Sequence, residues 1–124
     1  MSKWKKLSKD CEHSAQKLKD SGYLRGCVNR SYYAVYSAVT MLLLANGYIP
    51  EARREGPPHG DVLNLVGRVS SMRRERLEII GEKTRTLYKM RLDADYFATR
   101  TIDARMAKTS LIICRSVLKE LGVL

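Results

Sequence analysis

The sequence contains few of the residues that stabilise small secreted or metal-binding proteins. It has three cysteines, Cys11, Cys27 and Cys114, and no two of them form a Cys-x-x-Cys pair. An odd number of widely spaced cysteines argues against a disulfide framework and against a zinc site. All three fall on apolar helical stripes, so we expect small core residues, with a redox or nucleophilic role as the alternative.

Long apolar runs and cofactor motifs are also missing. No segment reaches the roughly 18 uninterrupted apolar residues of a membrane-spanning helix, and the N-terminal residues contain no hydrophobic signal core. We therefore expect a cytoplasmic protein without a membrane partner. There is no Gly-rich phosphate loop or Gly-x-Ser-x-Gly element, and the two histidines, His13 and His59, lie far apart. We expect no metal and no cofactor.

Acidic residues are scarce compared with basic ones. Lys and Arg number 23 against 13 Asp and Glu, which gives a net charge of +10 at pH 7. Half of this excess lies in residues 68–91, where eight basic residues occur with three acidic ones. Such a balance favours polyanionic partners, although a solvated helix with intrahelical ion pairs explains part of it.

Prolines occur only within residues 47–60, which we predict to be the one long loop. Elsewhere apolar residues recur every three or four positions, and no alternation predicts a strand. We predict helices from a Ser2 cap to Ser21-Gly22, over about 23–46, 61–69 and 73–98, and from a Thr101 cap onward. The 124 residues are thus predicted to form a single domain (1–124), an all-α antiparallel up-and-down bundle of four long helices plus one short helix.

Two of the predicted helices have distinct apolar faces. The 23–46 helix has two adjacent apolar stripes, one of them built from small residues, so we expect it to be the central helix. The stripe predicted to be buried on the first helix consists of Trp4, Leu7, Cys11, Ala15 and Leu18.

Arg91 interrupts the apolar seam of the 73–98 helix. Asp95 follows one turn later and is its natural partner, and Tyr88 shares the same helix face. A guanidinium on an apolar seam must be paired or must face a cleft. Two interpretations follow: a partly buried ion pair that fixes helix register, or the lining of an anion-binding or catalytic cleft.

Arg30, Tyr33 and Ser37 form a polar stripe beside the apolar stripes of the 23–46 helix. Arg30 can hold a phosphate with two N–H groups, and Tyr33 can stack or hydrogen-bond. The alternative is an arginine and a tyrosine at the bundle surface. His59 ends the proline loop, where it either makes a structural hydrogen bond or is held over a cleft between helices.

Three segments together resemble the HEPN superfamily: Asn29-Arg30-Ser31-Tyr32-Tyr33-Ala34-Val35-Tyr36-Ser37-Ala38, His59-Gly60 and Arg91-Leu92-Asp93-Ala94-Asp95-Tyr96. Over essentially its whole length the chain is similar to the small standalone HEPN proteins of the UPF0332 type. The resemblance implies a helical bundle that forms a homodimer and is often encoded beside a minimal nucleotidyltransferase. It also implies kinship with the metal-independent ribonucleases of toxin–antitoxin and antiviral systems.

The chain departs from the motif of the active members, an arginine followed after four to six residues by a histidine on a late helix. Asp95 and Tyr96 occupy that window after Arg91. The segment from Arg54 to His59 has the right spacing, but its two prolines exclude a helix, so we treat that match as chance.

Two functions are predicted. The first is a toxin-type metal-independent ribonuclease, or its degenerate relative, with Arg91, Asp95 and His59 as catalytic residues. Attack of a ribose 2′-hydroxyl needs a cation and a proton acceptor, and His59, with an ordinary pKa of about 6.5, is the one suitable base.

The alternative is a non-catalytic module that binds RNA, a nucleotide or a partner nucleotidyltransferase. Its predicted contacts are Arg30, Tyr33, Tyr88 and Tyr96. On this interpretation Tyr96 is a contact or an acceptor for a transferred nucleotide, by analogy with tyrosines near the motif in related members.

Overall fold

The computed structural model describes residues 2–124 and is built from helices. They are α1 (Lys3–Asp20), α2 (Leu24–Ala45), a 3₁₀ turn η1 (His59–Asp61), α3 (Val62–Val66), α4 (Arg74–Tyr96) and α5 (Ala104–Glu120). No strand occurs among residues 2–124. The predicted all-α fold of four long helices and one short helix is confirmed.

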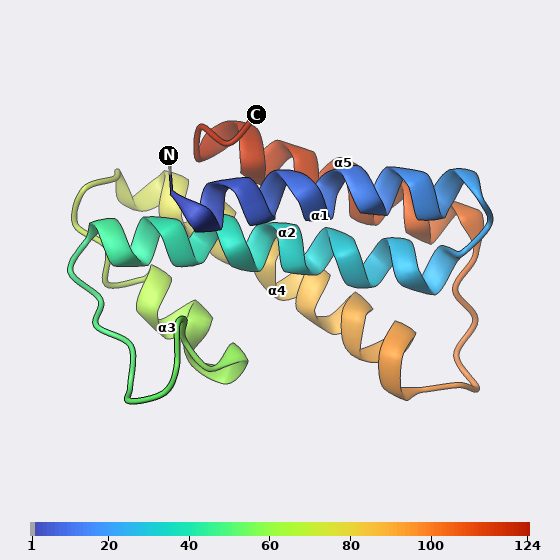
Figure 1. Ribbon diagram of the computed structural model, residues 1–124, viewed down its shortest axis with the longest axis horizontal. Helices are drawn as coiled ribbons and strands as arrows, with labels where there is room; N and C mark the ends of the chain where they lie inside the picture. Colours follow the sequence, from blue (N-terminus) through green and yellow to red (C-terminus); the bar gives the residue numbers. More distant parts are fainter. Residues whose placement is uncertain (1) are drawn as a thin grey trace.

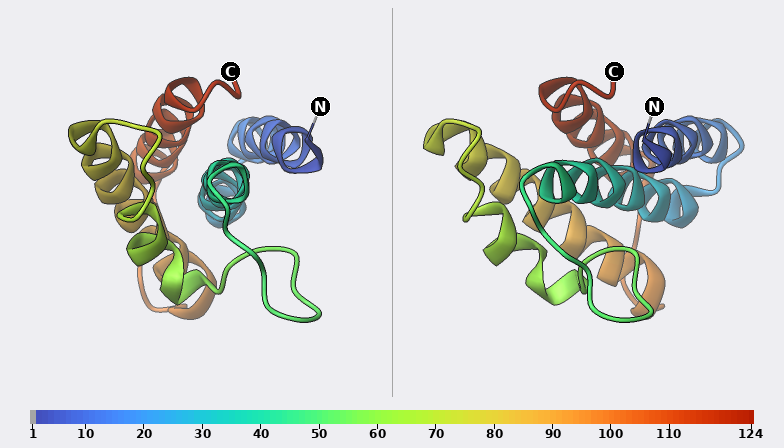
Figure 2. Two further views of the ribbon diagram at one scale, coloured as in Figure 1. Left: turned by 90° about the vertical axis from the view of Figure 1, so that its left-hand side faces the viewer. Right: turned by 60° about the vertical axis from the view of Figure 1, so that its left-hand side comes forward.

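The helix α2 lies at the centre of the bundle, as its wide apolar face predicts. It packs against α1, α3, α4 and α5, and the four long helices alternate in direction along the chain (Figure 1). The end-on view shows α2 between α1 and the layer formed by α3 and α4, with the long connection before η1 looping outward from the helices (Figure 2). This arrangement brings the middle of α2 against α4 and beside η1.

Local sequence signals set several helix ends. The Ser2 hydroxyl accepts a hydrogen bond from the Trp4 amide at 3.1 Å and caps α1. Gly22 and Gly47 adopt positive φ angles of 81° and 89° just after α1 and α2, a conformation that favours glycine.

The predicted cap of the last helix was wrong. Asp103, not Thr101, caps α5, and its carboxylate accepts a hydrogen bond from the Met106 amide at 2.8 Å. The Arg25 guanidinium holds the backbone carbonyl of Arg100, so the chain is still in the interhelical turn at Thr101 and the helix starts later.

The predicted buried stripe of α1 needs one correction. Leu7 is 45% exposed, and the neighbouring Ser8 is fully buried instead. The Ser8 hydroxyl donates to the Ala34 carbonyl of α2 at 2.7 Å. Small residues at this crossing let α1 approach α2 closely enough for that bond, and the bulkier leucine is left on the outer side.

The three cysteines are core residues, as predicted. Cys11, Cys27 and Cys114 are all free and buried. Burial raises the pKa of the Cys114 thiol to about 12, so it stays protonated at neutral pH and is a poor nucleophile. In residues 2–124, no helix is long and apolar enough to cross a membrane.

Candidate functional site

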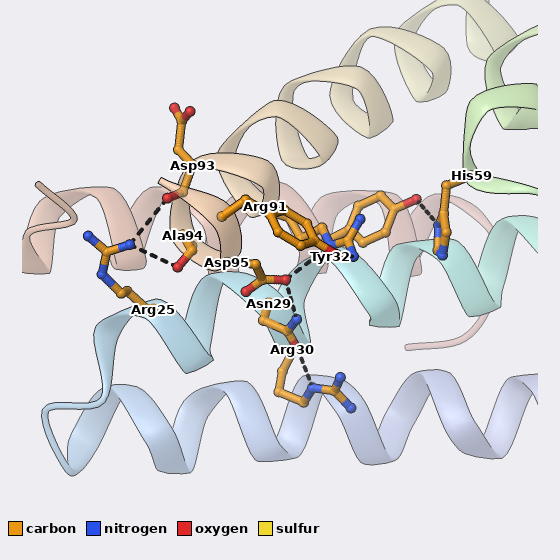
Figure 3. A network of polar contacts seen from close by, with 10 residues as sticks. Arg25, Asn29, Arg30, Tyr32, His59, Arg91, Asp93, Ala94 and Asp95 are labelled. Atoms are coloured by element: carbon orange, nitrogen blue, oxygen red, sulfur yellow. Dashed lines mark hydrogen bonds and ion pairs between the residues drawn. The ribbon is translucent and has the colours of Figure 1, made fainter. Parts of the chain in front are cut away.

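Arg91 is buried where α4 crosses α2. Its side chain is 10% exposed, and its Nε donates to Asp95 Oδ2 at 3.1 Å (Figure 3). A second N–H, on Nη2, donates to the Tyr96 hydroxyl at 3.2 Å. The partly buried ion pair predicted from the seam position is therefore present.

Aromatic rings surround the Arg91 guanidinium. Its central carbon lies 5.6, 5.4 and 5.3 Å from the ring centroids of Tyr32, Tyr33 and Tyr96, distances at which the ring faces attract a cation. Burial alone would lower the pKa of Arg91, but Tyr33, Tyr96 and Asp95 outweigh it and raise the pKa above its ordinary value. The group is a fixed positive charge.

A chain of polar contacts joins Arg91 to a second arginine. Asn29 of α2 donates to Asp95 Oδ2 at 2.8 Å, and its own amide oxygen accepts from Arg30 Nε at 2.8 Å (Figure 3). The Arg30 guanidinium lies 5.0 Å from the Tyr33 ring centroid. The guanidinium groups of Arg30 and Arg91 therefore both lie beside the ring of Tyr33, within 5.4 Å of its centroid.

His59 joins the same cluster from η1. Its Nδ1 lies 2.7 Å from the Tyr32 hydroxyl (Figure 3), and its ring centroid is 4.6 Å from that of Tyr36. Burial, followed by the positive charges of Arg91 and Arg54, lowers the pKa of His59 below 6.5. The imidazole is therefore neutral at pH 7 and can accept a proton.

The proline loop holds His59 by packing onto α2. The Tyr36 hydroxyl donates to the Pro57 carbonyl at 2.6 Å, and its ring lies edge-on to Trp4, with centroids 6.1 Å apart. Gly56 is buried at this contact. The loop thus enters η1 from a fixed point beside the site.

Gly56→Ala is expected to lower the free energy of unfolding by about 1–3 kcal/mol. An added Cβ would lie 2.8 Å from the Tyr36 hydroxyl and 3.3 Å from side-chain carbons of Thr40 and Trp4, so the phenol must move and its bond to Pro57 is lost. Urea unfolding measures the change. Gly60→Ala, where nothing lies within 4 Å, is the control, and equal losses in both variants would contradict the prediction.

Most of the residues singled out in the sequence meet around Tyr32 and Tyr33. Arg30, His59 and Arg91 contact one or both of these tyrosines directly. Asp95 and Tyr96 join the cluster through their hydrogen bonds with Arg91. Tyr88 is half-buried, and its ring centroid lies 5.6 Å from that of Tyr32. Ser37 is buried and donates to the Tyr33 carbonyl at 2.8 Å, so it faces the core.

Two residues of the cluster carried no predicted role. Asn29 was part of the recognised segment, but its bond to Asp95 depends on how α2 crosses α4. Arg25 holds the end of α4, and its guanidinium donates to the backbone carbonyls of Asp93, Ala94, Phe97, Ala98 and Arg100. One sequence signal could have pointed to both residues: Arg25 and Asn29 are four residues apart on one helix and therefore share a face.

The described part of the chain holds no cluster of metal-ligating side chains. Across residues 2–124, no three His, Cys, Asp or Glu side chains are grouped to hold a metal ion. A groove of about 600 Å³ lies between α3 and α4, but none of the predicted site residues lines it. The cluster around Arg91 therefore offers cations, phenols and one imidazole as its chemistry.

Comparison with protein-family models identifies a relationship that comparison with individual proteins does not. No curated protein and no solved structure is significantly similar to the chain. A family model described as the HEPN domain matches residues 1–124, and the segments that carry the resemblance are those that meet around Tyr32 and Arg91. Since the match covers the whole sequence, the chain belongs to the HEPN family.

Proposed function

We propose that this HEPN protein binds RNA over Arg30 and Arg91 and cleaves it without a metal ion. One observation carries the proposal: Tyr32 contacts the imidazole of His59 through its hydroxyl and the guanidinium of Arg91 through its ring. A neutral proton acceptor and a buried cation, distant in sequence, are the two groups that 2′-hydroxyl attack requires.

The reaction begins at the ribose 2′-hydroxyl. Its oxygen attacks the adjacent phosphorus, the bond from phosphorus to the 5′-oxygen breaks, and the products carry a 2′,3′-cyclic phosphate and a 5′-hydroxyl. His59 takes the 2′-proton, and the leaving 5′-oxygen takes a proton from water. For this step His59 donates from Nδ1 to Tyr32 and keeps a lone pair on Nε2.

Arg91 stabilises the charge that develops on the phosphoryl oxygens. Its bonds to Asp95 and Tyr96 use two of its five N–H donors. Asp95 receives hydrogen bonds from both Arg91 and Asn29, which favours a positioning role over proton transfer. Arg30 supplies a second cation beside Tyr33 for a neighbouring phosphate.

We place this activity in a toxin-type HEPN protein of the UPF0332 type that works as a homodimer with a minimal nucleotidyltransferase partner. The resemblance of the Asn29-to-Ala38 and Arg91-to-Tyr96 segments supports this assignment. In such a dimer two copies of the Arg91 cluster meet, and the second copy supplies further cations to the bound RNA.

Arg91→Ala is expected to reduce RNA cleavage at least about 100-fold, because the developing charge loses its fixed donor. The purified protein and the variant are incubated in EDTA with total RNA and a panel of structured RNAs, and the fragment ends are analysed for 2′,3′-cyclic phosphate. Arg85→Ala, which replaces an exposed arginine of α4, is the control and retains activity. RNA left intact by the unaltered protein in excess would contradict the nuclease.

A second candidate function is a non-catalytic module that binds RNA, a nucleotide or the partner. Tyr96 favours it, since its side chain is strongly exposed while its hydroxyl accepts a hydrogen bond from Arg91. That arrangement suits a nucleotide contact, or an acceptor oxygen for a nucleotide transferred by the partner. In the same assay this function gives intact RNA with a salt-dependent mobility shift.

A further inference from the structure

The end of α4 carries two consecutive exposed aromatic residues, each with a guanidinium beside its ring. Tyr96 is 66% exposed, and Arg91 lies 5.3 Å from its ring centroid. Phe97 is 46% exposed, and Arg100 lies 5.3 Å from its ring centroid. The pairing of Arg91 with Tyr96 belongs to the proposed site, whereas Phe97 and Arg100 have no role in it.

The turn that holds Phe97 and Arg100 is firmly anchored. The backbone carbonyls of both residues accept hydrogen bonds from Arg25, which also holds the carbonyls of Asp93 and Ala94 (Figure 3). The Arg100 side chain pairs with Asp93 at 3.6 Å and is 60% exposed. The ring and the cation are thus presented together on a fixed turn, with more than half of the Arg100 side chain open to solvent.

We propose that Phe97 and Arg100 bind the nucleotide that follows the one held at Tyr96 and Arg91, so that single-stranded RNA runs along the end of α4. The inference rests on the proposed function and names its substrate class. Each nucleotide of a single strand offers a flat base that can stack on a ring and one phosphate. An exposed ring with a neighbouring arginine matches that unit, and the unit occurs twice in adjacent positions.

The substrate must be single-stranded because the bases of a duplex are stacked on each other and cannot reach a protein ring. The chain's net charge of +10 favours a polyanion on this surface. Stacking tolerates any base, so the platform formed by Phe97 and Arg100 sets where the strand runs and leaves base choice open.

The test measures the binding of a fluorescent 2′-O-methyl oligouridine of about 12 nucleotides, a length within the range of single-strand binding sites. The 2′-O-methyl groups prevent cleavage by 2′-hydroxyl attack, so fluorescence anisotropy reports binding alone. Phe97→Ala is expected to weaken binding about tenfold, whereas Phe97→Tyr, which keeps a ring, restores it.

Arg100→Ala is expected to act through the phosphate instead. It weakens binding and reduces the slope of log K against log salt by about 0.7, the value for one phosphate contact on a single strand. Phe97→Ala leaves that slope unchanged. Ile112→Ala removes an exposed apolar side chain of α5, 56% exposed, and as the control leaves both affinity and slope as they are.

Three results would overturn the inference. In the first, Phe97→Ala binds like the unaltered protein while Arg30→Ala and Arg91→Ala weaken binding, so the proposed function survives and the platform does not. In the second, a duplex of the same length binds as tightly as the single strand. In the third, Phe97→Ala dissociates a dimer in sedimentation with RNA affinity unchanged, which assigns the ring to a protein contact. No binding of the single strand by the unaltered protein would remove both proposals.

Discussion

Asp95→Ala is expected to lower the free energy of unfolding by about 3 kcal/mol. The side chains of Arg91 and Asp95 are only 10% and 22% exposed, so the variant leaves a desolvated guanidinium without its counter-ion. It also removes the acceptor of the Asn29 amide. The loss exceeds what a surface pair would give, because exposed ion pairs contribute about 1 kcal/mol or less.

Urea unfolding of four variants separates pairing from packing. Arg91→Met removes the buried charge and keeps much of the side-chain volume, so it is expected to cost far less than Asp95→Ala. In the double variant the penalty of the unpaired charge disappears. Asp93→Ala removes the partner of the exposed Arg100 on the same helix and is the matched control. A loss of less than about 0.5 kcal/mol in Asp95→Ala would contradict the prediction.

This comparison bears on why a buried arginine stands on an apolar seam. Buried ion pairs are weak contributors to stability, and apolar replacements often match them. If Arg91→Met is as stable as the unaltered protein and yet no longer binds or cleaves RNA, the arginine serves chemistry. If it is stable and both RNA binding and RNA cleavage are unchanged, the pair only sets how α4 lies on α2.

The fold was predictable because it depends on local patterns. Apolar residues at intervals of three and four define the long helices, and prolines confined to residues 47–60 mark the one long loop. Arg91 was also predictable as an anomaly, since a helical wheel alone places it on the apolar seam. The structure confirms its burial and its pairing with Asp95, which lies on the same helix.

The contacts between helices were not predictable from such patterns. The bond from Asn29 to Asp95 and the bonds from Arg25 to the end of α4 join residues 66 or more positions apart. They depend on where α2 crosses α4. The wrong prediction that Leu7 is buried, where Ser8 is, has the same origin. Helical periodicity allows either residue to face inward, and only the close approach of α2 selects the serine.

His59→Gln is expected to reduce RNA cleavage by about 100-fold to 10,000-fold, the usual effect of removing a general base. The pH dependence identifies that role. Because burial and two arginines lower the pKa of His59, the cleavage rate of the unaltered protein rises with pH and reaches half its maximum below pH 6.5. The residual cleavage rate of His59→Gln does not show this rise with pH. Tyr32→Phe removes the hydroxyl that orients the imidazole, so its cleavage rate is expected to lie between those of the unaltered protein and His59→Gln.

The same residue gives a second readout that needs no nuclease activity. With the folded-state pKa of His59 below its unfolded value of about 6.5, the unfolded chain binds more protons in that interval, so stability rises with pH. Stability is therefore lost as the pH falls from about 6.5 through the folded-state pKa. Urea unfolding between about pH 7.5 and 5 should show a smaller loss in His59→Gln than in the unaltered protein, with His13→Gln as the exposed-histidine control. Equal slopes in the unaltered protein and His59→Gln would mean that the imidazole is not held beside Arg91 and Arg54 in solution, and the proposed base would then have no place in the site.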